Sequence, residues 1–273
     1  MSLGIIIKAP EGLVLAAESR VTLSATINNG PQQIHVNFDN ANKLLTFNDP
    51  YNKFGVVTYG LAILGGVRTA QSLIPEFETS LQGTEGPITV LAFAQKLSTF
   101  FQSQFVALMP PNTVVPPGQG MIFNVAGFDD NESYGKIYQF EIPTKPAPVE
   151  QNVKVNNKDT FGITAGGQNE IMARLLLGYD PRLPNILIQK GLVTADQVNK
   201  ILGPALEPLK LQAPIQLMPL QDCVNLAVLL IKTTIEAQSL SIGIRGCGGA
   251  IDVAIITKNN PLKFIQKKNI TVN

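Results

Sequence analysis

The sequence contains no tryptophan, a single histidine (His35) and only two cysteines, Cys223 and Cys247. Structural zinc sites use four ligands drawn mostly from cysteine and histidine, and three such residues do not make up that set. Two cysteines also fall short of the disulfide framework of a small secreted protein. Both lie among apolar residues or glycines, so we expect small buried hydrophobic side chains. The composition therefore predicts a reduced, cytoplasmic protein that uses no metal and no other cofactor.

Charged residues are also scarce, at 15% of the chain, and they nearly cancel to a formal net charge of +1. The sequence has no basic run and no one-sided cluster of lysine and arginine, which argues against nucleic acid as a partner. The longest apolar run near the C-terminus, Leu226–Ile231, is far too short for a membrane span, and the first residues lack the features of a secretion signal. With 45% hydrophobic residues, so few charges indicate extensive burial or a surface committed to other subunits.

Short hydrophobic runs recur along the chain and define the expected elements. The runs Ile5–Ile7 and Leu13–Ala17 flank a turn at Lys8–Gly12 and predict an N-terminal β-hairpin whose second strand is covered on both faces. Further strands are expected at 34–38, 43–47, 54–59, 121–128, 137–142, 161–167, 250–257 and 262–265. Helices are expected over 67–77, over a stretch opened by Pro87 that extends to 105, over 169–177, 186–190 and 194–203, and from Pro219 onward.

The order of these elements predicts the fold class. Strands, a pair of helices, more strands, more helices and final strands are typical of an α+β protein built as a four-layer α/β/β/α sandwich. A parallel doubly wound sheet fits less well, because the helices come in pairs and do not follow each strand. Residues 143–158, rich in proline, lysine and asparagine, are expected to form an exposed connection. The acidic stretch Asp129–Glu132 is expected to be a solvated turn, since it lacks the ligand spacing of a calcium loop.

Two charged residues follow the second strand of the predicted hairpin. Glu18 and Arg20 flank Ser19 at the end of an apolar run. An unpaired buried charge is very unfavourable, so both charged groups need partners. One interpretation is a structural ion pair that closes the hairpin. The other depends on the whole stretch from residue 2 to residue 22.

The stretch 12–22 reads Gly-Leu-Val-Leu-Ala-Ala-Glu-Ser-Arg-Val-Thr and resembles the start of a proteasome β-type subunit. In that family a carboxylate stands at the position of Glu18, and the nucleophile lies sixteen positions before it. Sixteen positions before Glu18, without a gap, is Ser2. Removal of the initiator Met1 would make Ser2 the amino terminus. The resemblance implies a bacterial or archaeal proteasome-like protein of the N-terminal nucleophile (Ntn) hydrolase class.

Three further stretches carry the same resemblance. Lys43 heads a Lys-apolar-apolar strand, like the lysine that the family places near its nucleophile. Thr58–Ala62 looks like the strand-to-helix turn whose glycine N–H lines the family's oxyanion hole, which gives that role to Gly60. The stretch 246–256 resembles the family's C-terminal Ser-Gly-Gly-strand signature, with Cys247 in the place of serine.

The sequence departs from the family pattern around the nucleophile. Glu18 is one methylene longer than the family's usual aspartate, and the nucleophile is a serine where the family prefers threonine. The positions of the family's supporting polar residues match Ala165, Ile244 and Cys247. The carboxylate and the lysine are kept while the supporting residues are replaced, so we expect slow or specialised catalysis.

The resemblance assigns catalytic roles to Ser2, Glu18, Lys43 and Gly60. A free α-amine, with a pKa of roughly 7.7–8.0, would take the hydroxyl proton, and the lysine held by the carboxylate would lower the hydroxyl pKa. The glycine N–H would stabilise the oxyanion. The family's substrate-binding positions match Val21, Thr22, Ala41, Thr58, Ala62 and Gly66. These small, uncharged residues imply a roomy apolar pocket and a peptide or unfolded protein as substrate.

Several functions stay open at this point. The first is a threonine/serine-type peptidase that cleaves peptide (amide) bonds, or a related amide transferase or peptide ligase. The second is a catalytically silent structural subunit of a proteasome-like assembly, and the third is an unrelated binding sandwich. The resemblance also implies a single domain over 1–273, a helical insertion at 178–217, and self-association into a ring or stacked homo-oligomer.

Overall fold

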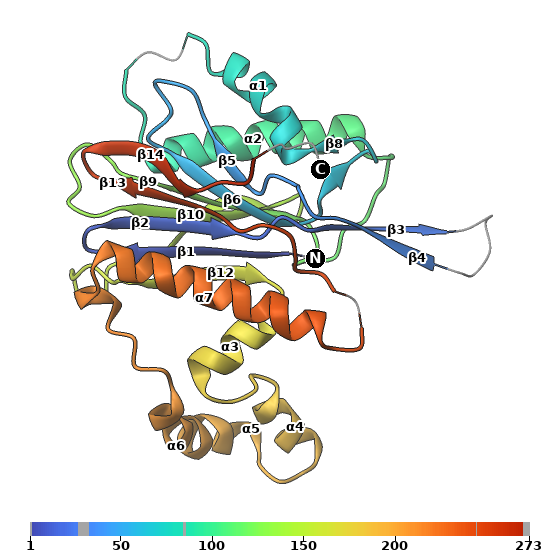
Figure 1. Cartoon of the computed structure of the whole chain (residues 1–273), viewed down its shortest axis with the longest axis vertical. Coiled ribbons are helices and arrows are strands. Elements are labelled where there is room, and N and C mark those ends of the chain that lie inside the picture. Colours follow the sequence, from blue (N-terminus) through green and yellow to red (C-terminus); the bar gives the residue numbers. More distant parts are fainter. Residues whose placement is uncertain (1, 27–32, 84–85, 244, 270–273) are drawn as a thin grey trace.

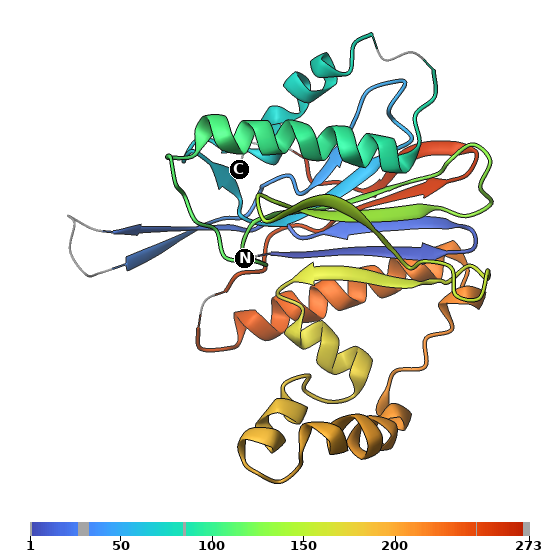
Figure 2. The ribbon, with the colours of Figure 1, turned by 180° about the vertical axis from the view of Figure 1, so that it is seen from behind.

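The computed structural model of the chain describes residues 2–26, 33–83, 86–243 and 245–269. Two five-stranded antiparallel sheets lie at its centre, with helices on either side of them (Figures 1 and 2). The prediction of a mixed α+β fold with antiparallel sheets is confirmed. Within the described residues, no helix combines the length and the apolar character needed to cross a lipid bilayer.

The first sheet contains the start of the chain and has the strand order β12-β1-β2-β13-β14. Its strands are β1 (Leu3–Ala9), β2 (Gly12–Ala17), β12 (Gly162–Gly167), β13 (Asp252–Thr257) and β14 (Asn260–Gln266). Every residue of β1 and β2 is buried, as their uninterrupted apolar runs predict. Because β1 is paired on both sides, Ser2, which directly precedes it, lies at the end of a central strand.

The second sheet has the strand order β11-β10-β9-β6-β5. Its strands are β5 (Leu44–Thr46), β6 (Gly55–Gly60), β9 (Met121–Gly127), β10 (Lys136–Ile142) and β11 (Lys145–Gln151). The stretch 143–158, predicted to be an exposed connection, contains in its first half the regular edge strand β11, which the sequence did not predict. Most β11 side chains are exposed or half-buried, so no apolar alternation marks this strand in the sequence.

Helices α1 (Ala70–Ser80) and α2 (Val90–Leu108) lie on the side of the second sheet, where α2 contacts β9, β10 and β11 (Figure 1). Both helices begin later than predicted. The side chains of Thr69 and Thr89 accept hydrogen bonds from the first turn of each helix, and these caps set the helix starts. Val67 therefore lies in the exposed turn before α1, and Pro87 precedes α2.

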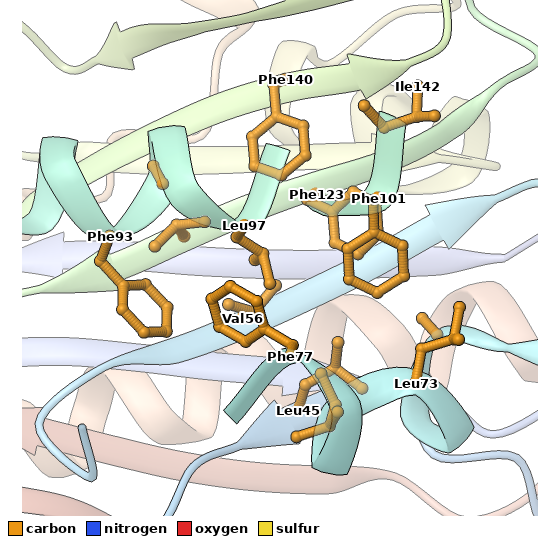
Figure 3. Packing of buried hydrophobic residues seen from close by; sticks show 14 of the residues in the cluster. Leu45, Val56, Leu73, Phe77, Phe93, Leu97, Phe101, Phe123, Phe140 and Ile142 are labelled. Carbon is orange, nitrogen blue, oxygen red and sulfur yellow. The ribbon is translucent and has the colours of Figure 1, made fainter. Parts of the chain in front are cut away.

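An aromatic core packs these two helices against the second sheet (Figure 3). Phe93 of α2 stacks on Phe54 with ring centroids 4.4 Å apart. Phe101 lies 4.5 Å from Phe123, which in turn stacks on Phe140 at 4.9 Å. The predicted apolar stripe of this helix is thus the face that it buries. A separate cluster of residues from both sheets, including Ile6, Leu15, Val57 and Tyr59, fills the space between them.

The other side of the first sheet carries α3 (Glu170–Leu177) and α7 (Leu220–Ser239), and α7 packs on β1 and β2 (Figure 1). The chain between them holds α4 (Leu183–Gln189), α5 (Ala195–Gln197), the π-helical turn Val198–Leu202, α6 (Gly203–Leu206) and the 3-10 turns Glu207–Leu209 and Ile215–Leu217. None of the residues of α4, α5 or α6 is buried, so this segment forms a lobe outside the core (Figure 2).

Two short hairpins stand outside the main sheets. The strands β3 (Val21–Thr26) and β4 (Gln33–Phe38) pair with each other and project away from the body as an arm (Figure 2). The strands β7 (Ile63–Leu64) and β8 (Arg68–Thr69) pair just before α1. The first hairpin directly follows Glu18 and Arg20, and the second follows Gly60, so both extend from the region around Ser2.

Candidate functional site

Ser2 lies buried at the end of the first sheet, where the turn after β12 closes over it. Its carbonyl oxygen accepts a hydrogen bond of 2.7 Å from the N–H of Gln168. Gly167 has a φ of +95°, and a Cβ atom at this position would lie 1.8 Å from the Ser2 carbonyl oxygen. Only glycine fits both the left-handed backbone and the close approach, so this turn is shaped around Ser2.

Glu18 is almost completely buried and accepts four hydrogen bonds. One carboxylate oxygen accepts from the Leu3 N–H at 3.1 Å and from the Lys43 ammonium. The other accepts from the N–H of Arg20 at 2.7 Å and of Gly248 at 3.0 Å. A buried charge is tolerated when it is paired and hydrogen-bonded in this way. The carboxylate therefore joins the start of β1, Lys43 and the turn before β13.

Lys43 is 5% exposed and also donates to the carbonyl oxygen of Arg20. Burial lowers the pKa of the Lys43 ammonium, and the neighbouring Glu18 carboxylate opposes this effect. The Glu18 carboxylate thus favours the charged form of Lys43, while burial disfavours it. In the structure, the charged partner of Glu18 is Lys43, and not the guanidinium of the neighbouring Arg20.

Arg20 makes its own ion pair on the outer side of the site. Its guanidinium donates to both carboxylate oxygens of Asp39, at 2.6 and 2.7 Å. Weaker contacts reach the carbonyl oxygens of Arg245 and Cys247, at 3.3 and 3.5 Å. A Cβ atom on Gly248 would lie 2.4 Å from this guanidinium, so the ion pair and the glycine turn are fitted to each other. This bidentate pair fixes the strand end that carries Glu18.

Most of the predicted site residues meet at one cavity of about 180 Å³ beside Ser2. It is lined by Ser2, Val21, Ala41, Lys43, Thr58, Gly60 and Ala62, together with Asn42, Tyr59, Leu61, Thr69, Ala70 and Gln71. A second cavity of about 780 Å³ extends to Thr22, His35 and Gln119 and shares four lining residues with the first, namely Ser2, Gly60, Leu61 and Ala62. Ser2 thus lies where the two cavities meet.

Two predicted residues occupy other positions. Glu18 does not line either cavity, and it binds two groups beside Ser2, the Lys43 ammonium and the N–H of Leu3. Gly66 lies in the exposed turn between β7 and β8 and does not line either of these two cavities. A Cβ atom on Gly66 would meet nothing within 4 Å. The structure therefore brings the expected catalytic residues together and leaves Gly66 apart from them.

Two of the three positions that match the family's supporting polar residues lie within the described part of the chain. Ala165 pairs with Ile5 on β1 and packs against the apolar cluster under α7. Cys247 is buried, and its N–H donates to the side chain of Gln238 at 2.9 Å. Ile244 lies outside the described residues. Gln168 lines the second cavity together with Ser2, and its side chain bonds to that of Gln238 at 2.5 Å. No sequence signal distinguishes these two glutamines from others.

Tyr59 supports the site from between the sheets and was also missed by sequence reasoning. Its ring lies against β1 and β12, where a Cβ atom on Gly4 or Gly166 would come within 3.2 or 2.2 Å of it. Its hydroxyl accepts hydrogen bonds from the side-chain amides of Asn124 at 3.2 Å and Gln139 at 2.9 Å. Burial raises the pKa of this hydroxyl, which stays protonated at neutral pH. Tyr59 thereby fixes the spacing between Gly60 on one sheet and β1 on the other.

The described residues contain no group of three or more histidine, cysteine, aspartate or glutamate side chains arranged to hold a metal ion. The site instead offers a hydroxyl, a lysine ammonium and glycine backbone groups. These are the components of acyl transfer to a serine.

No family model and no curated protein matches the chain. A helical assembly of the Anbu complex from Pseudomonas aeruginosa resembles it with a TM-score of 0.57 and 14% identity over 98% of this chain and 88% of that one. The chain shares a fold with Anbu proteins. A mutant Anbu from Hyphomicrobium sp. strain MC1 has a TM-score of 0.55 and 12% sequence identity, over 98% of this chain and 86% of that one. Anbu from Yersinia bercovieri, described as an ancestral beta-subunit, has a TM-score of 0.54 and 12% identity, over 97% of this chain and 87% of that one.

These comparisons correct the assignment to the proteasome β-type subunit family, which is wrong. The structures that share the fold are Anbu proteins at 12–14% identity, and this is a distant match in fold. The resemblance rests on short stretches at 2–22, 43, 58–62 and 246–256, while the whole chain shares only 12–14% identity with these Anbu structures. Short motifs of this kind mark a buried strand that ends at charged residues, and proteins of different families with a related fold can share them.

Proposed function

We propose that this chain is an N-terminal nucleophile hydrolase that cleaves peptide (amide) bonds, with Ser2 as the nucleophile after removal of Met1. The observation that carries the proposal is that Ser2, Lys43 and Gly60 line the same cavity. Glu18 supports it further, since the same carboxylate binds the Lys43 ammonium and the N–H of the residue after Ser2. The fold shared with Anbu, one of which is described as an ancestral beta-subunit, is in keeping with this chemistry.

In the proposed reaction, the free α-amine of Ser2 takes the hydroxyl proton, directly or through water, while the oxygen attacks the substrate carbonyl carbon. The amide C–N bond then breaks, the leaving amine receives the proton, and the acyl group remains as an ester on Ser2. A water molecule, activated by the same amine, hydrolyses the ester. The N–H of Gly60 stabilises the oxyanion of each tetrahedral intermediate, an effect worth about 3 kcal/mol for one donor.

Lys43 acts through its charge. An ammonium group next to Ser2 favours the developing negative charge on the hydroxyl oxygen, and low exposure to water strengthens this interaction. Burial lowers the pKa of Lys43, and the Glu18 carboxylate opposes this effect and so favours the protonated lysine. Glu18 is therefore proposed to act on the reaction through Lys43.

The first cavity is proposed to bind the side chain that precedes the scissile bond. Small, uncharged residues make up much of its wall, including Val21, Ala41 and Ala62. A cavity of roughly 150 Å³ accommodates benzene, so the volume of about 180 Å³ suits a single leucine- or phenylalanine-sized side chain. The adjoining larger cavity leaves room for the segment on the other side of the bond.

A catalytically silent structural subunit is the second candidate function. The observation that favours it is Cys247, which stands in the place of a supporting serine. Burial raises the pKa of its thiol to about 12, so the thiol stays neutral, and a neutral thiol is a weaker hydrogen-bond donor and acceptor than the serine hydroxyl that it replaces. The same fold and the same Glu18–Lys43 pair would then serve only stability.

We also propose a four-layer α/β/β/α arrangement, with 178–217 as a helical insertion in one domain that self-associates. Contacts of α2 with the second sheet and of α7 with the first support the layering. The chain exposes 14719 Å², whereas compact monomers of 29.4 kDa expose about 11,500 Å². One Anbu structure is described as a helical assembly, and the surplus surface here is available for contacts of that kind.

The enzymatic proposal is tested by peptide turnover with protein that begins at Ser2. Fluorogenic peptides with leucine, phenylalanine, lysine or aspartate before the scissile amide would be compared. We expect turnover of the leucine and phenylalanine peptides, and none with Ser2→Ala. Equal turnover by Ser2→Ala, or preference for the charged peptides, would overturn the proposed nucleophile or the proposed pocket, respectively. Complete lack of turnover and of Ser2 acylation favours the silent subunit.

A further inference from the structure

The C-terminal end of α7 reaches the turn that covers Ser2. Gln238, the second-last residue of α7, is half-buried and uses both ends of its side-chain amide. Its NH2 group donates to the side-chain oxygen of Gln168 at 2.5 Å, and its oxygen accepts from the N–H of Cys247 at 2.9 Å. We propose that Gln238 is a positioning residue for Ser2, an inference that rests on the proposed function and extends it.

The first arm of this contact leads directly to the nucleophile. Gln168 is held by Gln238 through its side chain, and its backbone N–H donates to the Ser2 carbonyl oxygen at 2.7 Å. The thiol of Cys247 lies 3.8 Å from the same Gln168 side-chain oxygen and adds a weak donor to it. Fixing the Gln168 side chain therefore fixes the peptide unit that holds residue 2.

The second arm leads to the carboxylate. Gln238 accepts from the N–H of Cys247, and the next N–H, that of Gly248, donates to Glu18 at 3.0 Å. Glu18 in turn binds Lys43 and the N–H of Leu3. One amide group thus sets the relative position of the Ser2 backbone and of the carboxylate that holds the lysine.

The helix provides a rigid base for this amide. Leu230, Ile231 and Thr234 of the preceding turns are buried against the first sheet. A glutamine bonded at both ends of its amide loses its rotational freedom, and because it is neutral it adds no charge to the site. These are the properties of a residue that orients a nucleophile while leaving its proton transfer to other groups.

The test compares wild type with Gln238→Leu and Gln238→Glu, all beginning at Ser2. Gln221→Leu is the matched control, because it makes the same change near the other end of α7, where the side chain is exposed and bonds only to Asn225 in the described contacts. One readout is hydrogen exchange of the Gln168 amide, with the amides of β2 as the reference for global opening. The other is acylation of Ser2 by a peptidyl β-lactone, whose ring carbonyl forms an ester with the serine hydroxyl as its ring C–O bond opens and takes up the hydroxyl proton.

Loss of one hydrogen bond corresponds to about a tenfold change in an equilibrium constant. We expect the Gln168 amide to exchange about tenfold faster in Gln238→Leu, with β2 amides unchanged and the Gln221→Leu control like wild type. The maximal acylation rate should fall by a similar factor while half-saturation by the β-lactone stays the same. In Gln238→Glu the donor is lost and a negative charge is added, so the pH midpoint of acylation should also rise, since a nearby anion raises the pKa of an amine.

The two levels of the proposal give different results if they fail. Unchanged exchange at Gln168 in both Gln238 variants, or the same change in Gln221→Leu, would overturn the positioning role. If the Gln168 amide exchanges faster in the Gln238 variants but wild-type protein cannot be acylated, the positioning of residue 2 is supported and the proposed hydrolase function is overturned. A fall in the melting temperature with unchanged acylation of the folded protein would assign Gln238 to stability alone and so overturn the inference.

Discussion

Lys43 and Lys8 are both buried lysines, but only Lys43 lies beside Ser2. Burial lowers the pKa of each, and each has a carboxylate near it: Glu18 for Lys43, and Asp159, at 3.8 Å, for Lys8. Lys8 is six positions along β1 from Ser2, which is about 20 Å in an extended strand. Substitution of Lys8 therefore shows the effect of losing a buried lysine on stability alone. Substitution of Lys43 shows in addition the effect of losing a charge beside the nucleophile.

The double substitution Lys43→Met with Glu18→Gln tests this distinction. It removes both charges without leaving either one unpaired, which would otherwise cost about 3–5 kcal/mol. We expect the variant to fold with stability near that of wild type and to lose acylation of Ser2 by at least about a hundredfold, because the electrostatic assistance is gone. Acylation would be followed by mass spectrometry.

Lys8→Met is the control for this experiment and should acylate at the wild-type rate after any change in the folded fraction is taken into account. If wild type is not acylated and the double variant is more stable, the Glu18–Lys43 pair is structural, and the silent subunit is the correct interpretation.

Gly167 provides a second test at the scale of single residues. Gly167→Ala should destabilise the protein by more than the roughly 1–2 kcal/mol expected for a left-handed residue, because its methyl group would meet the Ser2 carbonyl oxygen. Gly191→Ala is the control, since Gly191 also has a positive φ but a methyl group there would meet nothing within 4 Å. Denaturant unfolding measures both. Equal losses for the two variants would show that the turn is not fitted to Ser2.

At the scale of elements, strands with continuous apolar runs were predictable, whereas the exposed edge strand β11 was not. The hairpin of β1 and β2 follows from its sequence because burial on both faces requires apolar residues at every position. The strand β11 has no such pattern, because backbone pairing to β10 holds it in place while its side chains stay largely exposed. Helices α1 and α2 begin later than predicted because their first residue is set by the N-cap hydrogen bonds of Thr69 and Thr89, and not by the nearby Val67 or Pro87.

The ion pair between Arg20 and Asp39 joins the end of β2 to the segment after β4, and it predicts a pH dependence. The guanidinium lowers the pKa of Asp39, so its stabilisation is present above the unfolded pKa of roughly 4 and is lost as the pH falls through the folded value. Asp39→Asn should therefore lower the free energy of unfolding by about 1 kcal/mol at pH 7, and this difference should vanish in acid.

Chemical denaturation between pH 2.5 and 7 checks this prediction, with Asp130→Asn as the control. Asp130 pairs with Lys53 at 3.3 Å on the surface, where its side chain is 63% exposed, and its loss should have little effect. An Asp39→Asn effect of the same size at pH 2.5 as at pH 7 would show that it does not arise from the ion pair.

At the scale of the whole molecule, the sequence predicted which residues meet but not what holds them. Ser2, Glu18 and Lys43 could be found because their spacing resembles a known pattern, and the structure brings them together. Gln168 and Gln238 are 70 positions apart, and their contact arises only when α7 packs across the first sheet. The contacts of Tyr59 likewise arise only in the folded chain, since its hydrogen-bond partners come from two other strands, β9 and β10. Contacts of this kind carry no local signal in the sequence.

Self-association is the prediction that belongs to the whole molecule. The arm of β3 and β4 exposes Val36 and Phe38, and the lobe between α3 and α7 exposes Leu192, Ile201 and Leu209. Light scattering at low micromolar concentration should give the mass of an oligomer, since stable interfaces bury over about 1,000 Å². Phe38→Asp or Ile201→Asp should dissociate it if the substituted side chain lies in an interface. A mass of 29.4 kDa at all concentrations would contradict self-association.

The central claim is that Ser2 reacts when its α-amine is free. The most direct measurement is the rate of acylation by a peptidyl β-lactone for two forms of the same chain, one beginning at Ser2 and one keeping Met1, with the modified residue identified by peptide mass spectrometry. The account predicts a single adduct on Ser2 in the first form and at least a hundredfold slower reaction in the second, because its amine is tied up in a peptide bond, so that general base catalysis, worth about 10²–10⁴-fold, is lost. Equal rates in the two forms, or an adduct on any other residue, would contradict it.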